Sequence, residues 1–334
     1  MKNRLKNSLK KRIRIIMFYL VSSRLASIYF KLTKKKYLND KTSRWGDIWW
    51  YGYLFNFALH FDVNTVRGRG LPKRRIKTLI PNYDYFLFYN TVFHLDCLSH
   101  VIYELASGYI PVIDDTWGVW KQFFEQPVEP LKSDERLEDI ELSDELSTLY
   151  TPTLVPYCKI VRKLWSRLIK EYCRFNDKEY QYIEKESREV LSKGNRVLAI
   201  VCRGTDYINS GMAKQPEICD VISTAEKWMN KYNYDKIYLA TEDETIYKQF
   251  EEAFPGKILV NKRSYYDKAM KEQNVGAIGR VHFDRENDDY LKGLEYLSSI
   301  ILVSRCKALL GGYCGATNMA LLYNSEKYER FKVL

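Results

Sequence analysis

The amino-acid sequence predicts an α/β protein with doubly wound parallel sheets. Short apolar runs alternate with segments of helical length through residues 194–324, and polar clusters follow three of these runs. Parallel strands joined by crossover helices give this alternation. Because 46% of the 334 residues are apolar, the chain can bury a core, which excludes a disordered or low-complexity protein. At about 150 residues per domain, the length indicates roughly two domains.

The amino-terminal arm carries the excess positive charge. Residues 1–36 contain twelve Lys and Arg and no acidic residue, so the total of +11 leaves a net charge of −1 for the rest of the chain. A nucleic-acid-binding domain needs a basic face on its folded body, and this balance argues against a nucleic-acid partner. A second basic cluster, over 67–77, is interpreted as a solvated loop.

Apolar residues lie between the basic residues of the arm. The longest uncharged run, 15–23, is far shorter than the roughly twenty residues of a membrane-spanning helix, and no signal-peptide cleavage site follows it. Two interpretations remain open. The arm is either an amphipathic helix lying on an anionic membrane surface, or a helix packed on the body with a basic face toward solvent.

Cysteine and histidine usage indicates a reduced, cytoplasmic protein without a structural metal. The seven cysteines are scattered and form no C-x-x-C pair. The four histidines show no zinc-ligand spacing.

We divide the chain into an arm over 1–45, an amino-terminal domain over 46–177 and a carboxyl-terminal domain over 178–334. In the amino-terminal domain we expect a helix over 91–106 and a strand near 110–113, because a glycine stops the helix before a short apolar run. The acidic stretch 132–145 is interpreted as a loop with helical pieces. A long helix over 178–193 connects the two domains.

The carboxyl-terminal domain gives the clearest pattern. Glycines bound the first apolar run, and Pro216 suits the first turn of the following helix. We expect strands at 196–202, 236–240, 257–260 and 308–310, and helices at 216–231, 245–254, 288–304 and 315–323.

Three polar clusters follow these strands: 203–207, 241–243 and 311–318. In a parallel sheet they converge at the carboxyl edge, where ligands bind. Arg203 offers a fork of donors that matches a phosphate, and a glycine-rich turn opening a helix offers backbone amides. Together the clusters predict a nucleotide-diphosphate pocket. Taken singly, Arg203 could pair with Asp206, and Glu242 and Asp243 could cap the next helix.

Three segments resemble the peptide motifs of the α1,6- and O-fucosyltransferase superfamily, which includes bacterial nodulation-type members. They are 197–207 (Val-Leu-Ala-Ile-Val-Cys-Arg-Gly-Thr-Asp-Tyr), 237–243 (Ile-Tyr-Leu-Ala-Thr-Glu-Asp) and 293–324, in the family's order. Residues 109–127 are similar to the acceptor half of bacterial relatives.

This resemblance implies a GT-B architecture of two Rossmann-like domains with parallel sheets, here preceded by the basic arm. It also implies an inverting transfer from a GDP-sugar, GDP-fucose in characterised members, without a divalent metal. Arg203 would contact the β-phosphate, where a diphosphate leaving group develops charge. The positions that match the nucleotide-binding residues are Arg203, Thr205, Tyr207, Glu242, Asp243, Ser298, Ser299, Gly315, Ala316 and Thr317.

The chain departs from the motifs at three positions. Val201 stands where the family commonly has His, and Gly204 where some members have a second Arg, so the base contact differs. Gly211 replaces an acidic residue that α1,6 enzymes place beyond the Arg.

The general base is therefore open. Asp206 is the catalytic candidate beside Arg203, and Glu217, Asp114 and Glu125 are alternatives, since a base must reach the acceptor hydroxyl. For each of two of these residues a structural role is as good an interpretation as a catalytic one. Asp206 could be a helix N-cap, and Glu217 could interact with a helix dipole from the first turn.

The function expected from these features is transfer of a sugar, with fucose as the leading candidate, from a GDP-sugar to a glycan or lipid-linked oligosaccharide. Such a reaction would belong to surface polysaccharide or glycoconjugate synthesis. The expected location is the inner face of a membrane, with peripheral attachment through residues 1–36. The alternatives are a transferase using another nucleotide sugar, such as a UDP-sugar, and a non-catalytic sugar-nucleotide-binding relative.

Overall fold

The computed structural model describes residues 154–210 and 214–334, together with scattered residues between 9 and 137. The chain divides into two compact units, and among the described residues the boundary falls between Arg174 and Phe175. The six cysteines in this part of the chain, from Cys158 onward, are free thiols.

The first unit contains a three-stranded parallel sheet in the order β2-β1-β3. Its strands are β1 (Ile76–Leu79), β2 (Ile110–Ile113) and β3 (Arg136–Leu137). The strand expected near 110–113 is thus present. The short strand β3 falls in the acidic stretch that we expected to be a loop with helical pieces. Of the helix expected over 91–106, residues 101, 102, 104 and 105 are helical and buried, and the others lie outside the described residues.

Helix α8 (Lys159–Tyr172) ends the first unit and was not expected from the sequence. Its buried side chains recur every three or four residues, which is the spacing of one helical face. They are Val161, Leu164, Trp165, Leu168, Ile169 and Tyr172, all fully buried. The helix follows from this apolar spacing, which is partly hidden by four basic residues between the apolar ones.

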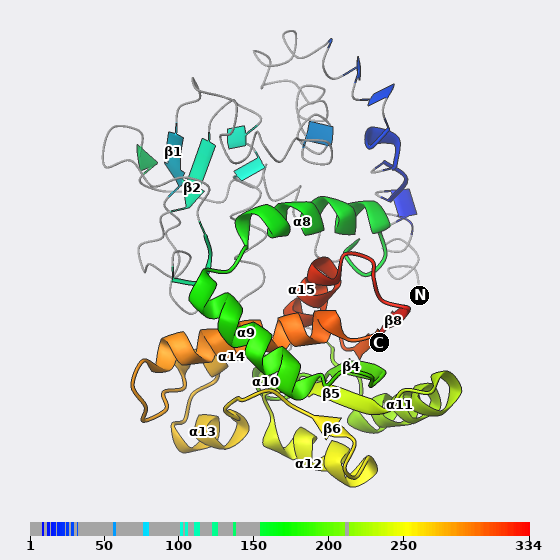
Figure 1. Ribbon diagram of the computed structural model, residues 1–334, viewed down its shortest axis with the longest axis vertical. Coiled ribbons are helices and arrows are strands. Elements are labelled where there is room, and N and C mark those ends of the chain that lie inside the picture. Colours follow the sequence, from blue (N-terminus) through cyan, green and yellow to red (C-terminus); the bar gives the residue numbers. More distant parts are fainter. Residues whose placement is uncertain are drawn as a thin grey trace. The chain divides into compact units, whose positions relative to one another are not determined.

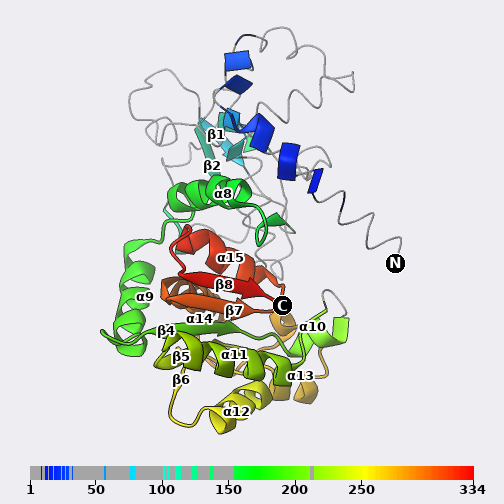
Figure 2. The ribbon, with the colours of Figure 1, turned by 90° about the vertical axis from the view of Figure 1, so that its right-hand side faces the viewer.

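The second unit is built on a five-stranded sheet in the order β6-β5-β4-β7-β8, in which every pair is parallel. Figures 1 and 2 show the strands side by side in one sheet, with helices on both faces of the sheet. The strands are β4 (Val197–Val201), β5 (Lys236–Ala240), β6 (Ile258–Leu259), β7 (Ala308–Gly311) and β8 (Arg330–Val333). Val201 pairs with Gly311, so strands far apart in sequence are neighbours at the centre of the sheet.

Alternating side chains of the central strands divide the core between two helical layers. Leu198 and Ile200 of β4 pack with α11 (Ile218–Tyr232) and α12 (Glu244–Ala253) on one face. On the other face α14 (Asp288–Arg305) contacts β4 and β5, α15 (Gly315–Asn324) packs against α14, and α9 (Asp177–Val190) lies against α14. This arrangement is the doubly wound α/β fold that the sequence predicts.

In the second unit the observed elements agree closely with the expected ones, apart from short segments. Strand β5 has the expected bounds, and the helix expected over 178–193 is α9, which ends three residues earlier. Four short elements of this unit were not expected from the sequence: α10 (Thr205–Ser210), α13 (Asp267–Glu272), η3 (Ile278–Arg280) and β8. The helical pieces are too short for an amphipathic period, and β8 is a short edge strand.

Candidate functional site

The candidate site lies at the carboxyl edge of the five-stranded sheet. The chain leaves β4 toward α10 and α11 on one face, and leaves β7 toward α15 on the other. Because β4 and β7 are neighbours, their following loops diverge and leave a crevice, which is the usual ligand position in a doubly wound sheet.

Arg203 extends into this crevice directly beyond β4. Its side chain is 10% exposed, with Nη2 2.9 Å from Asp206 Oδ1 and Nη1 3.4 Å from Glu242 Oε2. The guanidinium lies 4.7 Å from the ring centroid of Tyr207. Burial opposes the charge of Arg203, but Glu242 and Asp206 outweigh it and hold its pKa above the ordinary range. The Nε–H is buried and has no acceptor within the described part of the chain.

Glu242 fastens the turn that carries Arg203. This buried carboxylate accepts hydrogen bonds from Gly204 N and Thr205 Oγ1, both at 2.9 Å. Thr205 begins α10 with φ of 31°, a conformation that a β-branched residue rarely adopts. The bonds to Glu242 therefore hold a strained turn that aims Arg203 at the crevice.

Asp243 has a local structural role. It is the N-cap of α12, where its Oδ1 accepts from Ile246 N at 3.1 Å. A Cβ added at Gly204 would collide with the Asp243 carboxylate. A side chain larger than that of glycine therefore does not fit at position 204 unless Asp243 moves.

The glycine-rich turn after β7 brings the start of α15 to the site. Gly315 N lies 3.5 Å from Tyr207 Oη, and Ala316 lines a pocket shared with Arg203. Thr317 is fully buried and donates its hydroxyl to Gly312 O at 2.7 Å, so it holds the turn. The first turn of α15 thus borders the crevice, and the amino end of a helix is a suitable position for an anion.

The two predicted serines of α14 lie in different surroundings. Ser299 accepts from Tyr238 Oη at 3.1 Å and lines the same pocket as Arg203. Ser298 is fully buried and donates to the carboxylate of Glu186 in α9, away from the pocket lining. A nucleotide contact by Ser298 stays a prediction, because Ser298 is not among the residues that line the two hollows.

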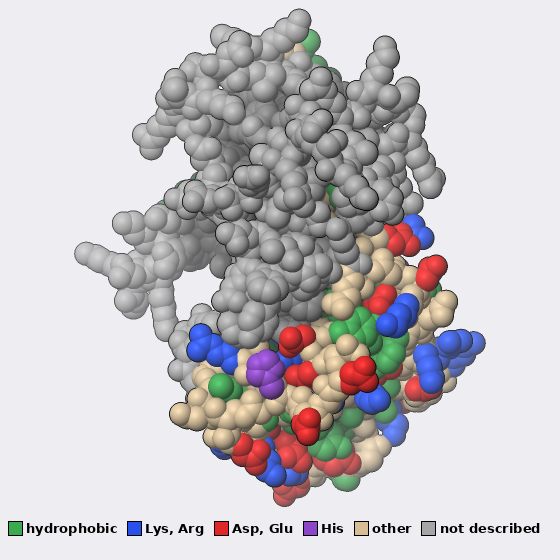
Figure 3. Space-filling view, turned by 90° about the vertical axis from the view of Figure 1, so that its left-hand side faces the viewer, with side chains coloured by type: hydrophobic (Ala, Val, Ile, Leu, Met, Phe, Trp, Pro, Cys, Tyr) green, Lys and Arg blue, Asp and Glu red, His purple; other side chains and the backbone are tan. Residues whose placement is uncertain are grey.

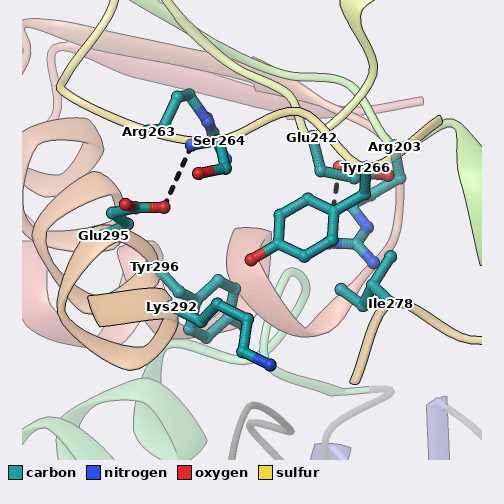
Figure 4. A pocket seen from close by; sticks show the side chains of 9 residues that line it. All are labelled: Arg203, Glu242, Arg263, Ser264, Tyr266, Ile278, Lys292, Glu295 and Tyr296. Atoms are coloured by element: carbon teal, nitrogen blue, oxygen red, sulfur yellow. Dashed lines mark hydrogen bonds and ion pairs between the residues drawn. The ribbon is translucent and has the colours of Figure 1, made fainter. Parts of the chain in front are cut away.

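The pocket also contains residues that the sequence analysis did not select. Two adjoining hollows share Arg203, Glu242, Arg263 and Tyr296, and Figure 4 shows the residues that line one of them. Arg263 follows β6 much as Arg203 follows β4. Its Nε and Nη1 are buried and have no acceptor among the described residues. The position of Arg263 just beyond an expected strand is the feature of the sequence that could have identified it as a pocket residue.

The remaining charged residues of the pocket, Lys292 and Glu295, form ion pairs with residues outside its lining. Lys292 is buried and forms ion pairs with Asp288 at 3.1 Å and Asp289 at 2.8 Å. Glu295 accepts from Ser264 N at 3.0 Å and pairs with Arg285. Burial raises the pKa of Tyr296 despite the nearby Arg203, so its phenol is neutral and can donate.

Cysteine chemistry is not indicated at this site. Cys202 immediately precedes Arg203, and burial raises its pKa to about 12. Burial also raises the pKa of Cys314, which lies at the start of α15. Both remain thiols near neutral pH, whereas a nucleophilic cysteine acts as the thiolate.

The candidates for a general base differ in their surroundings. Asp206 is 8% exposed and paired with Arg203. Glu217 is exposed and is the N-cap residue of α11, with no side-chain capping bond. In the first unit, Glu125 pairs with Arg174 at 3.1 Å, and Asp114 lies outside the described residues. Asp206 is thus the candidate that shares the crevice with Arg203.

One group of possible metal ligands occurs among the described residues. Single ligand atoms of His282, Asp288 and Asp289 lie within 4.8 Å of one another. Both carboxylates already pair with Lys292, and Asp288 pairs with Arg285 as well. The group is therefore electrically compensated.

Comparison with known proteins finds similarity only in structure. No family model matches the chain, and no curated protein matches its sequence. The fucosyltransferase NodZ from Bradyrhizobium is similar over 74% of this chain and 93% of its own, with 16% identity and a TM-score of 0.44. NodZ α1,6-fucosyltransferase soaked with GDP-fucose is similar over 75% and 93%, with 16% identity and a TM-score of 0.42. POFUT1 in complex with GDP is similar over 51% and 49%, with 13% identity and a TM-score of 0.32.

Proposed function

We propose that this protein is a glycosyltransferase whose crevice binds the diphosphate of a nucleotide sugar, with GDP-fucose as the first donor to test. The observation that supports it is a pair of guanidinium groups, Arg203 and Arg263, lining one pocket with buried N–H groups that lack acceptors in the described structure. A buried unsatisfied donor costs about 1–3 kcal/mol, and more when charged. A bound diphosphate would supply the missing acceptors.

The surroundings of the pair favour a phosphate over a carboxylate ligand. Arg203 lies beside Tyr207, which in turn lies at the first amide of α15. A phosphate can accept bonds from a guanidinium and from helix amides at once. Glu242, which also lines the pocket, is positioned for donor groups of a sugar or base.

In the proposed reaction an acceptor hydroxyl attacks the anomeric carbon of the sugar. The bond from that carbon to the diphosphate oxygen breaks, and the nucleoside diphosphate leaves with the electron pair. Arg203 and Arg263 stabilise the charge that develops on the leaving group. Asp206 takes the proton of the hydroxyl. Displacement from the opposite face inverts the anomeric centre.

Thermal unfolding with nucleotides tests this proposal. A ligand that binds only the folded state raises its stability, by about 2.7 kcal/mol at a hundredfold excess over Kd. We expect GDP and GDP-fucose to raise the Tm of the wild type. The rise should be lost in Arg203→Ala and reduced in Arg263→Ala.

Arg196→Ala is the matched control. Arg196 precedes β4 at the opposite edge of the sheet and pairs with Glu329 at 2.8 Å. This variant should keep the response to GDP. A preference for UDP would assign another nucleotide sugar as donor. Binding of GDP-fucose without release of GDP in the presence of a panel of glycan acceptors would favour a non-catalytic sugar-nucleotide-binding protein. No response to any nucleotide would overturn the proposal.

A further inference from the structure

The described residues between 9 and 32 are helical, apart from a turn at Ser22 and Ser23. These segments appear in blue in Figure 1. No helix among the described residues is long and apolar enough to cross a bilayer. The arm lies either on a membrane surface or against the body of the protein. Whether its apolar side chains are buried or exposed decides between these two interpretations.

Large apolar side chains of the arm are exposed along one helical face. Spacings of three and four residues place them on one side of each helical segment. In the first segment they are Leu9, Ile13, Ile16 and Leu20, between 49% and 67% exposed, and in the second Leu25, Ile28, Tyr29 and Leu32, between 52% and 80% exposed; Met17 and Tyr19, to either side of the face in the first segment, are exposed as well. We call the eight residues of this face the arm stripe.

The arm stripe is unusual within this protein. Outside residues 9–32, the exposed large apolar side chains of the described chain are Tyr157 and Tyr180. A contiguous exposed apolar surface of this kind marks an interaction site in a folded protein.

A different side of the helix contacts the rest of the protein. Ile15 and Ser22 lie on the side of the helical wheel away from the stripe, and both are half-buried. Asn56 Nδ2 donates to Val21 O at 2.8 Å and to Ser23 O at 3.4 Å. A helix packed on the body by its apolar stripe would bury the stripe, and the structure has it exposed.

The charge of the arm identifies the partner. Residues 1–36 hold twelve basic side chains and no acid, and Arg12 among them is exposed. A second copy of the chain would bring like charges together. A nucleic acid would leave the apolar stripe in water. A bilayer with anionic head groups accommodates both, because apolar side chains enter the acyl boundary while Lys and Arg remain at the phosphates.

We propose that the arm stripe and its basic flanks dock this protein on an anionic membrane surface, with the helices lying in the plane of the interface. This inference is independent of the proposed function, because it uses no residue of the pocket.

Co-sedimentation of the full-length protein with lipid vesicles tests it. We use phosphatidylcholine vesicles with roughly a third phosphatidylserine, and neutral phosphatidylcholine vesicles for comparison. The double variant Ile16→Ser with Leu20→Ser keeps the net charge and should partition about tenfold more weakly. Raising the salt concentration should weaken binding of the wild type. Tyr180→Ser, which removes an exposed apolar side chain elsewhere, should bind as the wild type does.

Equal Tm values for the variants confirm that folding is unaffected. Failure of the wild type to bind anionic vesicles would overturn the inference, and so would unchanged binding by the double variant. If sedimentation velocity shows a dimer that the double variant loses, and no vesicle binding occurs, the stripe is a contact between copies and the inference is wrong.

Discussion

Gly204 shows how one residue limits what this site can contain. The space that a side chain would occupy is filled by the carboxylate of Asp243. Asp243 in turn caps α12, and Glu242 beside it holds the turn of Arg203. The loops after β4 and β5 therefore pack closely because position 204 has no side chain.

We predict that Gly204→Ala lowers the free energy of unfolding by about 1–3 kcal/mol, because overpacking must displace Asp243 from its cap. It should also weaken the Tm response to GDP. Urea denaturation measures the first effect. Gly276→Ala is the control, since a Cβ at Gly276 meets open space, and it should change stability by about 0.5 kcal/mol or less. Equal stability of the two variants would contradict this account.

At the scale of elements, the segment between β6 and α14 forms one wall of the pocket and has its own small core. Tyr266, Met270 and Val281 pack together there. Polar contacts fasten the segment to the start of α14: Asp288 accepts from Phe283 N at 3.1 Å and from Arg285 Nε at 2.7 Å. Both a small apolar core and the polar contacts of Asp288 therefore stabilise this wall of the pocket.

Low pH should reduce the stability that Asp288 contributes to this segment. Burial opposes the charge of Asp288, but the bonds from Phe283, Arg285 and Lys292 outweigh it and hold its pKa below the usual value. A lowered pKa in the folded state contributes stability above the unfolded pKa of about 4, and that contribution is lost as the pH falls through the folded value. Asp288→Asn should therefore be less stable than the wild type at pH 7, with a gap that narrows below about pH 4.

Asp289→Asn serves as the control for this pH series. Asp289 also pairs with Lys292, but its side chain is 61% exposed, so its pair should contribute little at any pH. Denaturant titrations at several pH values measure both variants. A gap for Asp288→Asn that does not change with pH would contradict the electrostatic explanation.

The sequence predicted the longer elements of the second unit because their periodicity is local, whereas the apolar spacing of α8 in the first unit is interrupted by basic residues and this helix was not predicted. The pattern of β5 and of α14 depends on the residues themselves, so both agree with the expectation. Arg203, Glu242 and Ala316 could be selected because each follows a strand or opens a helix in the pattern. Arg263 follows a strand and could have been selected on the same ground, whereas Tyr296 could not, because it reaches the pocket from a face of α14 that only tertiary packing positions.

At the scale of the whole molecule, charge is divided unevenly along the chain. Residues 175–334 hold as many acidic as basic residues, and Figure 3 shows the two kinds intermixed on one face of this unit. The positive excess lies in the arm. Long-range attraction of an anionic donor is therefore weak, and its binding depends on the local arrangement of the pocket.

Hydrogen exchange locates the donor site within the molecule. We predict that GDP slows amide exchange over 203–207, 263–266 and 315–317, because these segments border the pocket. Exchange in α8 of the first unit and at the amino ends of the strands should not change. Mass spectrometry of peptic fragments measures this pattern, and protection confined to other segments would place the nucleotide elsewhere.

The pairing of Val201 with Gly311 has a consequence for synthesis of the protein. The two halves of the crevice are separated by more than a hundred residues of chain, and β7 and α15 lie near its end. A nascent chain therefore cannot form the complete crevice until β7 and α15 have been synthesised. Products truncated before β7 would retain Arg203 and yet lack the second wall, so they should not compete with the full-length protein for the donor.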